Sequence, residues 1–211
     1  MRISEIYSTI HGESQYAGLP CAIVRTTGCD LRCSYCDTTY AFVGGREMSL
    51  REIVAEVKQL GLPWVLLTGG EPMLQPDIGE LARQLTEDGF EVAIETSGAH
   101  PVDGLPSAVR RILDVKTPSS GEDKRMCWPA FSGLRPCDAV KFVLTDEADY
   151  QWSVGQISRL GLLGRTEVLL SPVHGRLDPR RLVEWVVRDR LPVRINLQLH
   201  KYIWGPEAKG V

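Results

Sequence analysis

Long apolar runs are missing from this sequence of 211 residues. No stretch approaches the roughly 20 apolar residues that a membrane-spanning helix needs. The first five residues, 1–5, carry one arginine and no apolar segment, which argues against a secretory signal peptide. We therefore expect neither a membrane partner nor export.

Charge of one sign is also not in excess. The net charge is −3, and no run of lysines and arginines is interleaved with aromatic residues. Nucleic-acid-binding proteins usually carry such a basic surface, because they neutralise backbone phosphates. Nucleic acid is therefore not an expected partner.

Cysteine is scarce, since six cysteines are too few for a disulfide scaffold in a chain of this length. Three of them, Cys29, Cys33 and Cys36, fall within eight residues. This crowding indicates a metal site in a reducing compartment, and we expect the protein to be cytoplasmic.

What the sequence does contain is an alternation of short β-branched apolar runs and amphipathic stretches, with no linker dividing it. The predicted strands are Arg2–Tyr7, Ala22–Thr27, Trp64–Thr68, Glu91–Thr96, Ile112–Lys116, Ala139–Leu144, Glu167–Leu170 and Arg194–Leu199. Such alternation is typical of parallel sheets with right-handed crossovers. A closed barrel of eight βα units needs about 250 residues. We therefore expect a single domain, residues 1–211, of the α/β class: an incomplete, open (βα) barrel with mostly parallel strands.

Three helices are predicted to follow Ser49, Asp77 and Asp178, each of which can cap a helix N-terminus. Ser49 forms a capping box with Glu52. The third helix is expected to turn these side chains inward: Leu182, Val183, Val186 and Val187. A fainter pattern predicts a fourth helix over 145–160.

The cysteine loop, residues 28–38, has the spacing Cys-x3-Cys-x2-Cys directly after an apolar strand. Soft thiolates favour zinc or iron–sulfur centres. A structural zinc site normally has four protein ligands, and no fourth Cys or His flanks the loop. Three thiolates on a four-iron cluster leave one iron free for a chelating ligand. The spacing favours a cluster, while a zinc loop completed by tertiary folding stays open.

Polar residues follow five of the predicted strands. These clusters are Thr68–Pro72, Glu95–Gly98, Asp114–Lys116, Ser171–His174 and Gln198–Lys201. Each alone could be a solvated turn. The carboxyl ends of parallel barrel strands share one rim, which carries the chemistry in such folds. Together the clusters predict a site for a polar, charged ligand, where Gly69-Gly70 permits close backbone approach and Glu71 can accept bonds from an ammonium group.

The cysteine spacing and the Gly-Gly-Glu of 69–71 resemble the signature of the radical S-adenosylmethionine (SAM) superfamily. The resemblance implies a [4Fe–4S] cluster on Cys29, Cys33 and Cys36. The reduced cluster would pass an electron to SAM, giving methionine and a 5′-deoxyadenosyl radical. The SAM contacts that the resemblance implies are Tyr35, Asp37, Gly70, Glu71, Ser97, Asp114, Val115, Lys116, Ser171, Pro172, Val173 and His174.

The N-terminal segment narrows the resemblance to one family. Residues 6–14, Ile-Tyr-Ser-Thr-Ile-His-Gly-Glu-Ser, resemble the opening of the 7-carboxy-7-deazaguanine synthases. Further similarity extends to Gln198–Tyr202. The sequence departs from the family at His11, where Gln is common, and at Ser14, where Gly is common. Both departures affect the substrate-binding segment, not the cluster.

This family resemblance implies conversion of 6-carboxy-5,6,7,8-tetrahydropterin to 7-carboxy-7-deazaguanine with loss of ammonia, feeding queuosine or another 7-deazapurine. It implies Mg²⁺ at Thr38 beside the pterin substrate, a flavodoxin-like or other electron donor, and a homodimer. Arg25 suits the substrate carboxylate because a guanidinium can bind it bidentately. The pterin-binding residues expected are Ile10, His11, Gly12, Glu13, Arg25, Thr68 and His200. No side chain is assigned as a catalytic acid, base or nucleophile.

Bland alternatives remain for several of these residues. Arg25 could form a surface ion pair, Glu13 could be solvated, and His200 could equally be a core histidine. Two other functions also remain: an activating enzyme for glycyl-radical proteins, which would share the cysteine and glycine motifs, and a non-catalytic zinc or iron–sulfur module. The first is disfavoured by Gly12-Glu13 and Arg25, and the second leaves the polar strand ends unexplained.

Overall fold

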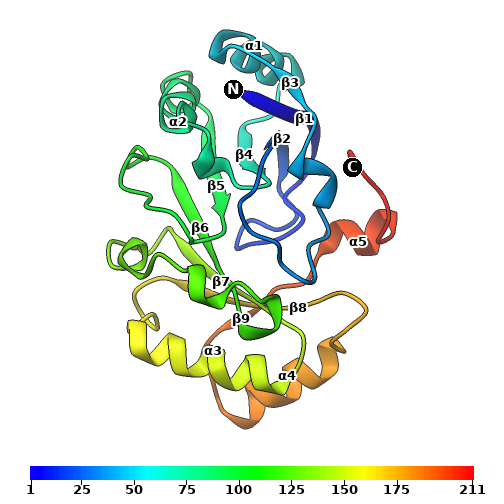
Figure 1. The fold of residues 1–211 in the computed structure, drawn as a ribbon, viewed down its shortest axis with the longest axis vertical. Helices are drawn as coiled ribbons and strands as arrows, with labels where there is room; N and C mark the ends of the chain where they lie inside the picture. The colour runs from blue at the N-terminus through cyan, green and yellow to red at the C-terminus, as the bar shows by residue number, and fades with distance from the viewer.

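The computed structural model describes residues 1–211, and one curved, open sheet runs through it (Figure 1). The strands are β1 (Arg2–Ile10), β2 (Pro20–Thr26), β3 (Arg46–Glu47), β4 (Trp64–Gly69), β5 (Glu91–Thr96), β6 (Arg110–Val115), β7 (Ala139–Leu144), β8 (Glu167–Pro172) and β9 (Arg194–Ile195). Their order is β3-β1-β2-β4-β5-β6-β7-β8-β9, so the edge strands β3 and β9 are not paired with each other. Strands β2 and β4 to β9 pair in parallel, whereas β1 pairs antiparallel with both β2 and β3. The prediction of an open, mostly parallel α/β barrel is confirmed.

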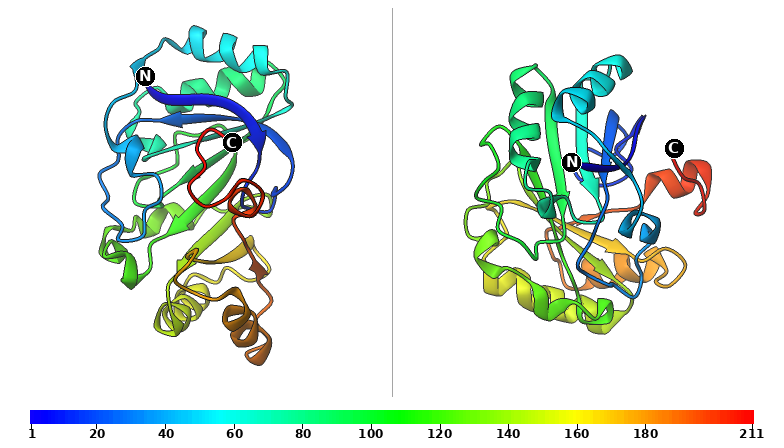
Figure 2. Two further views of the ribbon diagram at one scale, coloured as in Figure 1. Left: turned by 90° about the vertical axis from the view of Figure 1, so that its right-hand side faces the viewer. Right: turned by 45° about the horizontal axis from the view of Figure 1, so that its top comes forward.

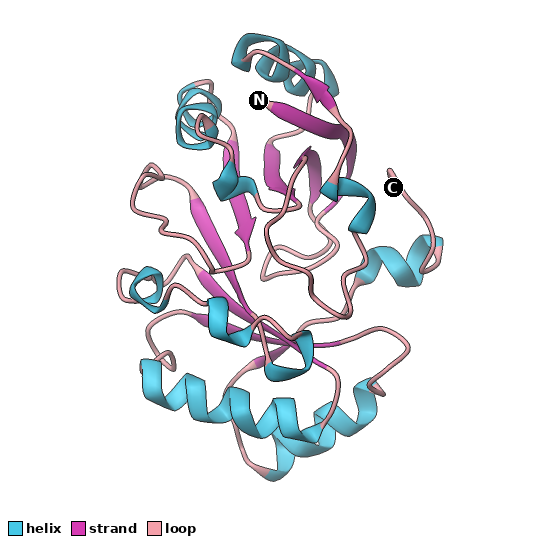
Figure 3. Cartoon of the chain, in the orientation of Figure 1, coloured by secondary structure: helices cyan, strands magenta, loops and turns pink.

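The α-helices are α1 (Leu50–Leu60), α2 (Ile78–Glu87), α3 (Glu147–Leu160), α4 (Pro179–Arg188) and α5 (Leu199–Trp204). Helices α1 to α4 lie on the outer side of the sheet, and α5 lies to one side of it (Figure 3). The 3₁₀ turns are η1 (Thr39–Phe42), η2 (Pro72–Leu74), η3 (Pro118–Ser120), η4 (Asp123–Arg125) and η5 (Trp128–Phe131). No helix combines the length and the apolar character that crossing a membrane requires.

Two apolar clusters join helices to the outer face of the sheet. One packs α1 and α2 on β2, β4 and β5, with Ile53, Val57 and Leu81 fully buried. The other packs α3 and α4 on β6, β7 and β8 and includes Tyr150 and Trp185. The outer face is therefore filled by the core, and the inner, concave face stays free for a site.

Helix α1 begins as predicted. The Ser49 hydroxyl accepts a bond from the Glu52 backbone N–H, the Glu52 carboxylate accepts one from the Ser49 N–H, and Gly61 ends the helix in the left-handed conformation. Asp77 precedes α2 but makes no capping bond, so that prediction is wrong. Its φ of −94° and ψ of 8° lie outside the extended region in which a side chain reaches the first amide groups.

The inward face of α4 is also narrower than predicted. Leu182, Trp185 and Val186 are buried, but Val183 is 42% exposed and Val187 is 69% exposed. Residues three and four apart share a helix face, and the broad indole of Trp185 occupies the space between α4 and the sheet. The predicted inward positions of Val183 and Val187 are therefore wrong.

The C-terminal region departs most from the prediction. The expected strand Arg194–Leu199 is paired only at its first two residues, β9, and Leu199 begins α5. Helix α5 and the two-residue β3 were not predicted, because segments this short carry no periodic signal. Tyr202, Ile203 and Trp204 of α5 are exposed.

Candidate functional site

A cavity of about 570 Å³ occupies the inner face of the sheet. Its volume lies within the range of small-molecule sites in proteins. Residues from the N-terminal segment, the cysteine loop, most strands and the C-terminal segment 206–211 line it. Figure 2 (left) shows this C-terminal segment in red, beside the early strands.

The inner face of the sheet carries two layers of side chains. The lower layer is apolar and consists of Cys21, Ile23, Leu66, Ala93, Ile112, Ala139 and Leu169. Because alternate residues of a strand face the same side, the next inward residue on each strand lies two positions later. These next residues are polar and all line the cavity: Arg25, Thr68, Glu95, Asp114, Lys141 and Ser171. The apolar layer therefore forms a floor beneath a polar layer.

The three clustered thiols, Cys29, Cys33 and Cys36, all line this cavity. Backbone bonds hold the loop around them: the Gly28 N–H donates to the Ala41 carbonyl at 2.8 Å, and the Ser34 N–H to the Ser120 carbonyl at 3.0 Å. Burial raises the pKa of the Cys33 thiol to about 11 and also raises those of the other two. Any metal centre here would have to displace the thiol protons.

The Gly-Gly-Glu loop packs directly on the cysteine loop. The Glu71 N–H donates to the Gly28 carbonyl at 2.8 Å. A Cβ atom at Gly70 would lie 2.2 Å from the Gly28 oxygen and 3.0 Å from the Cys29 Cβ. Any larger residue at position 70 would push the two loops apart, so the sequence pattern has a steric cause here.

The Glu71 side chain does not face the cavity, which corrects its prediction as a direct ligand contact. It is fully buried, and its carboxylate accepts bonds from the Thr96 hydroxyl at 2.7 Å and from the Ser97 N–H at 2.7 Å. A third bond comes from the Met73 N–H. Glu71 thus fixes the end of β5, where Ser97 lines the cavity.

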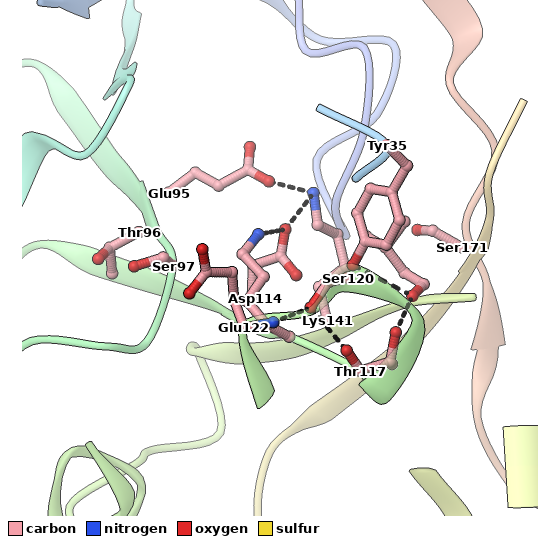
Figure 4. Close-up of polar contacts among 12 residues, drawn as sticks. Tyr35, Glu95, Thr96, Ser97, Asp114, Thr117, Ser120, Glu122, Lys141 and Ser171 are labelled. Atoms are coloured by element: carbon pink, nitrogen blue, oxygen red, sulfur yellow. Dashed lines mark hydrogen bonds and ion pairs between the residues drawn. The ribbon is translucent and has the colours of Figure 1, made fainter. Parts of the chain in front are cut away.

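Asp114 and Lys116 project into the cavity from β6 and the residue after it. The Lys116 Nζ lies 3.0 Å from Asp114 Oδ2, whereas Asp114 Oδ1 is buried without a hydrogen-bond partner. An unpaired buried carboxylate oxygen is costly, so this atom is poised for a ligand donor. Figure 4 shows Asp114 among the neighbouring polar groups. Val115, by contrast, packs its side chain in the outer core, so any contact with a ligand would have to come from its backbone.

The remaining predicted ligand contacts lie around the same cavity. Its lining includes Tyr35, Asp37, Gly70, Ser97, Ser171, Pro172, Val173 and His174. The Tyr35 ring is partly buried, and burial raises its pKa to about 12. The Ser171 hydroxyl accepts a bond from Asn196 Nδ2 at 2.7 Å, which joins β8 to the residue after β9.

Residues 10–14 cross the cavity after β1, and Ile10, Gly12 and Glu13 line it. A Cβ at Gly12 would lie 2.1 Å from Nδ1 of His200, so glycine is required for this approach. His200 itself lines the cavity and is not a core histidine. The segment thereby brings the two ends of the chain together.

The His11 side chain is buried away from the cavity. It is 1% exposed and packs between Tyr16 and Trp64, with ring centroids 5.8 and 5.4 Å away. Neither imidazole nitrogen has a partner, and burial lowers its pKa to about 4. The side chain lies outside the cavity, so any contact of His11 with a ligand would have to come from its backbone.

Arg25 lines the cavity on β2 and is held from one side. Its Nε donates to Glu5 Oε1 at 2.6 Å and its Nη2 to the Tyr7 hydroxyl at 3.2 Å. The Tyr40 hydroxyl donates to the same Glu5 oxygen at 2.9 Å. Nη1 has no protein partner, so the guanidinium is fixed in place with donors still available to an anion.

Thr38 also lines the cavity, next to the last cluster cysteine. Its hydroxyl donates to Asp37 Oδ1 at 3.0 Å, and Asp37 Oδ2 accepts from Lys201 Nζ at 2.6 Å and Gln198 Nε2 at 3.1 Å. Although burial opposes it, the Lys201 charge holds the pKa of Asp37 well below its usual value. The loop carrying Thr38 is thereby tied to α5.

Sequence reasoning assigned no role to several residues that line the cavity, namely Tyr7, Tyr40, Lys141 and 206–211, or to Glu5, which accepts a bond from Arg25. Lys141 had one available signal, since a lysine interrupts the apolar run Ala-Val-Lys-Phe-Val-Leu of β7. A buried charge inside a strand usually needs a partner or a function. The others had no sequence signal of their own.

Comparison with known proteins gives a consistent result. The radical SAM superfamily model matches residues 23–119. The 7-carboxy-7-deazaguanine synthase of Chlorobaculum tepidum is 46% identical over 100% of this chain and 97% of its own length, and that of Koribacter versatilis is 43% identical over 100% of both. The crystal structure of QueE from Escherichia coli has a TM-score of 0.78 and 22% identity and covers 93% of each chain, which shows a shared fold. The motifs and the full-length similarity together make this chain a member of the 7-carboxy-7-deazaguanine synthase family, within the radical SAM superfamily.

Proposed function

We propose that the cavity converts 6-carboxy-5,6,7,8-tetrahydropterin to 7-carboxy-7-deazaguanine with loss of ammonia; the names of the relatives give the product. The observation that carries the proposal is that three cluster thiols, the free side of Arg25 and the Glu13 carboxylate line one cavity of substrate size. One cavity thus contains both the thiols for a radical-generating centre and the charged groups for a pterin.

The residues present fit the two cofactors of the family, a [4Fe–4S] cluster and SAM. Cys29, Cys33 and Cys36 would hold the cluster, and the free iron would take the amino and carboxylate groups of SAM. The buried, unpaired Asp114 Oδ1 supplies an acceptor for a hydroxyl or ammonium donor. When bound, the cluster and SAM supply a carbon radical that removes a hydrogen atom from the substrate.

The chain's own residues orient SAM in this proposal. Gly70 lets the Gly-Gly-Glu loop approach the cysteine loop. Glu71 fixes Ser97 by accepting a hydrogen bond from its backbone N–H. The Tyr35 ring, Lys116 and the segment 171–174 complete the lining. These groups bind SAM and exclude water from the cavity, and none of them transfers a proton.

The substrate carboxylate is assigned to Arg25, whose Nε is occupied by Glu5 and whose Nη1 is free. A charge-assisted bond of this kind contributes about 1.5–3 kcal/mol. The pterin ring edge is assigned to Glu13, with Ile10, Gly12, Thr68 and His200 around it. Mg²⁺ is assigned to the Thr38 oxygen; because this ion keeps several water ligands, one protein oxygen is sufficient.

The alternatives fit the molecule less well. A single zinc ion needs converging ligands, and no three His, Cys, Asp or Glu side chains are grouped to hold one ion. An activating enzyme for a glycyl-radical protein would need an open groove for a polypeptide, whereas this cavity is lined by the segment 206–211 and by Ile10, Gly12, Glu13 and Ser14.

Several further assignments belong to the same proposal. The chain is a single domain, since one sheet runs from Arg2 to Ile195. It acts in the cytoplasm, where thiols stay reduced. It receives electrons from a flavodoxin-like or similar donor and forms a homodimer, to which the exposed Tyr202, Ile203 and Trp204 are suited.

The experiment is anaerobic reconstitution followed by mass spectrometry of the carboxypterin incubation. The protein is expected to hold about four irons and to give a product that has lost ammonia. Cys33→Ala should lose the visible absorbance of the cluster and all turnover, while Cys137→Ala, at an exposed free cysteine, should keep both. Turnover of a glycyl-radical partner without turnover of the pterin would replace this proposal.

A further inference from the structure

Lys141 is the only cation in contact with three carboxylates of the cavity. It projects inward from the middle of β7, and its side chain is 6% exposed. Its Nζ lies 2.8 Å from Glu13 Oε2 and 3.4 Å from Asp114 Oδ2, and it also donates to Glu95. Figure 4 shows Lys141 with Glu95 and Asp114 converging on it. Two of the three ammonium donors are thus bound to Glu13 and Glu95, and the charge also lies beside Asp114.

Stability alone gives a poor reason for this arrangement. Burying a charged group and its partners costs about as much as their attraction returns, and apolar residues of similar size often serve a fold as well. The neighbouring inward positions on other strands, such as Ile112 and Leu169, show that this face can be packed without charge. A role in the site is the better explanation for the lysine.

The arrangement of Glu13 indicates that role. Oε2 accepts from Lys141 Nζ at 2.8 Å and Oε1 from Gln198 Nε2 at 2.8 Å. A carboxylate has about four acceptor positions, so one lone pair on each oxygen is left. Two parallel N–H donors on one edge of a ligand can occupy this pair of positions, as in carboxylate–guanidinium pairs. The pyrimidine edge of a pterin, with its ring N3–H and 2-amino group, has this pattern.

The electrostatics agree with the geometry. Burial alone would raise the pKa of Glu13, but the ammonium of Lys141 and its hydrogen bond bring it below the usual value. For Glu95, burial dominates, and the pKa lies above the usual value despite Lys141. Of the two glutamates, Glu13 is therefore the one that Lys141 keeps ionised as a hydrogen-bond acceptor.

We propose that Lys141 is a positioning residue: with Gln198, it holds the Glu13 carboxylate in one orientation, with a free lone pair on each oxygen directed at the two N–H donors of the pterin edge. This inference rests on the proposed function, because it takes a pterin as the occupant of the cavity. It assigns ring recognition to a residue that never touches the ring.

The test measures discrimination between two ligands rather than activity. The reconstituted enzyme is titrated with 6-carboxypterin and with 6-carboxylumazine, in which an oxygen replaces the 2-amino group. A site built for the second N–H should reject the lumazine strongly, by about a hundredfold or more. Lys141→Met should reduce this preference by at least about tenfold. KM for the substrate 6-carboxy-5,6,7,8-tetrahydropterin should rise more than kcat falls, and the Kd of SAM should change little. Lys58→Met, at an exposed lysine paired with Asp88, is the matched control and should bind like wild type.

Two further variants protect the test against loss of folding. Lys141→Met combined with Glu95→Gln removes one buried charge of each sign, and Gln198→Leu removes the other bond to Glu13. Both should lose part of the preference for the pterin. An unchanged preference in the variants that fold would overturn the inference. If wild type neither binds 6-carboxypterin nor converts 6-carboxy-5,6,7,8-tetrahydropterin, the proposed function fails instead.

Discussion

Two buried charge clusters lie three residues apart at β7 and differ in how completely they are paired. Asp138, just before the strand, is buried and accepts bonds from the backbone N–H and guanidinium groups of both Arg111 and Arg135. Lys141, within the strand, faces several carboxylates, and one nearby oxygen, Asp114 Oδ1, has no partner. The first cluster is saturated, whereas the second keeps acceptor positions open.

The difference separates a structural cluster from a ligand site. A saturated carboxylate has nothing left to offer a ligand, so Asp138 can only join β6, β7 and the loop at Arg135. An unsaturated cluster is costly in the free protein, and a ligand can recover that cost when it binds. We therefore expect substitutions at Asp138 to change stability and substitutions in the cavity to change binding.

The largest effect is expected for Asp138→Ala. Removing one partner of a buried ion pair leaves two guanidinium groups without their acceptor and should lower the free energy of unfolding by about 3–5 kcal/mol. Urea denaturation measures this change. The surface variant Asp88→Ala, which loses an exposed pair with Lys58, should change it by less than about 1 kcal/mol. Equal losses of stability in both variants would show that the Asp138 cluster contributes no more than an exposed ion pair.

Acid should weaken the saturated cluster next. Burial opposes ionisation of Asp138, but the two arginines hold its pKa at about 2, below the unfolded value of about 3.9. A lowered pKa in the folded state gives stability that is complete above pH 4 or so and is lost as the pH falls through about 2. The loss should be on the order of 2 kcal/mol. The difference in unfolding free energy between wild type and Asp138→Asn should therefore narrow between pH 5 and pH 2, and a constant difference would count against this pKa.

Arg25→Lys tests the open side of the comparison. The ammonium keeps the charge beside Glu5 but loses the free Nη1 donor, so KM for the carboxypterin should rise about tenfold, equivalent to about 1.4 kcal/mol. Stability should barely change. Steady-state kinetics with Arg46→Lys, an exposed arginine paired with Glu56, provides the control. A marked loss of stability without a change in KM would make Arg25 a structural residue.

Exposed helix caps should give the smallest effects and set a baseline for both clusters. Ser49→Ala removes a complete capping box and should cost about 1 kcal/mol. Asp77→Ala removes a side chain that makes no capping bond and should change stability by less than about 0.5 kcal/mol. Thermal or urea unfolding of the two variants measures both changes in stability. A larger cost at Asp77 would mean that it caps α2 in solution.

Local signals in the sequence were enough for most of the fold. Seven of the eight predicted strands occur close to their predicted bounds, because β-branched runs bounded by turns carry a strong signal, and the eighth is reduced to the two residues of β9. The Ser49 capping box also predicted the start of α1, because both of its residues lie within one helical turn. The predictions failed where tertiary packing decides, as at Val183 and Val187, which lie beside a large Trp185 side chain on α4.

The candidate site divides in the same way. The cysteine spacing and Gly69–Glu71 were visible because their chemistry needs residues close together in the chain. The partners of Arg25 and Glu13 were not visible, since Glu5 lies 20 residues from Arg25 and Lys141 lies 128 residues from Glu13. Pairs at such separations have no periodicity or motif to indicate them.

The sequence by itself therefore determined the cysteine loop, the parallel strands and the family. Only the tertiary structure decided which carboxylates share Lys141, that Glu71 and His11 point away from the cavity, and that the C-terminal segment lines it. The physical reason is that strand alternation fixes which residues face inward, while the curvature and stagger of the whole sheet fix which inward residues meet.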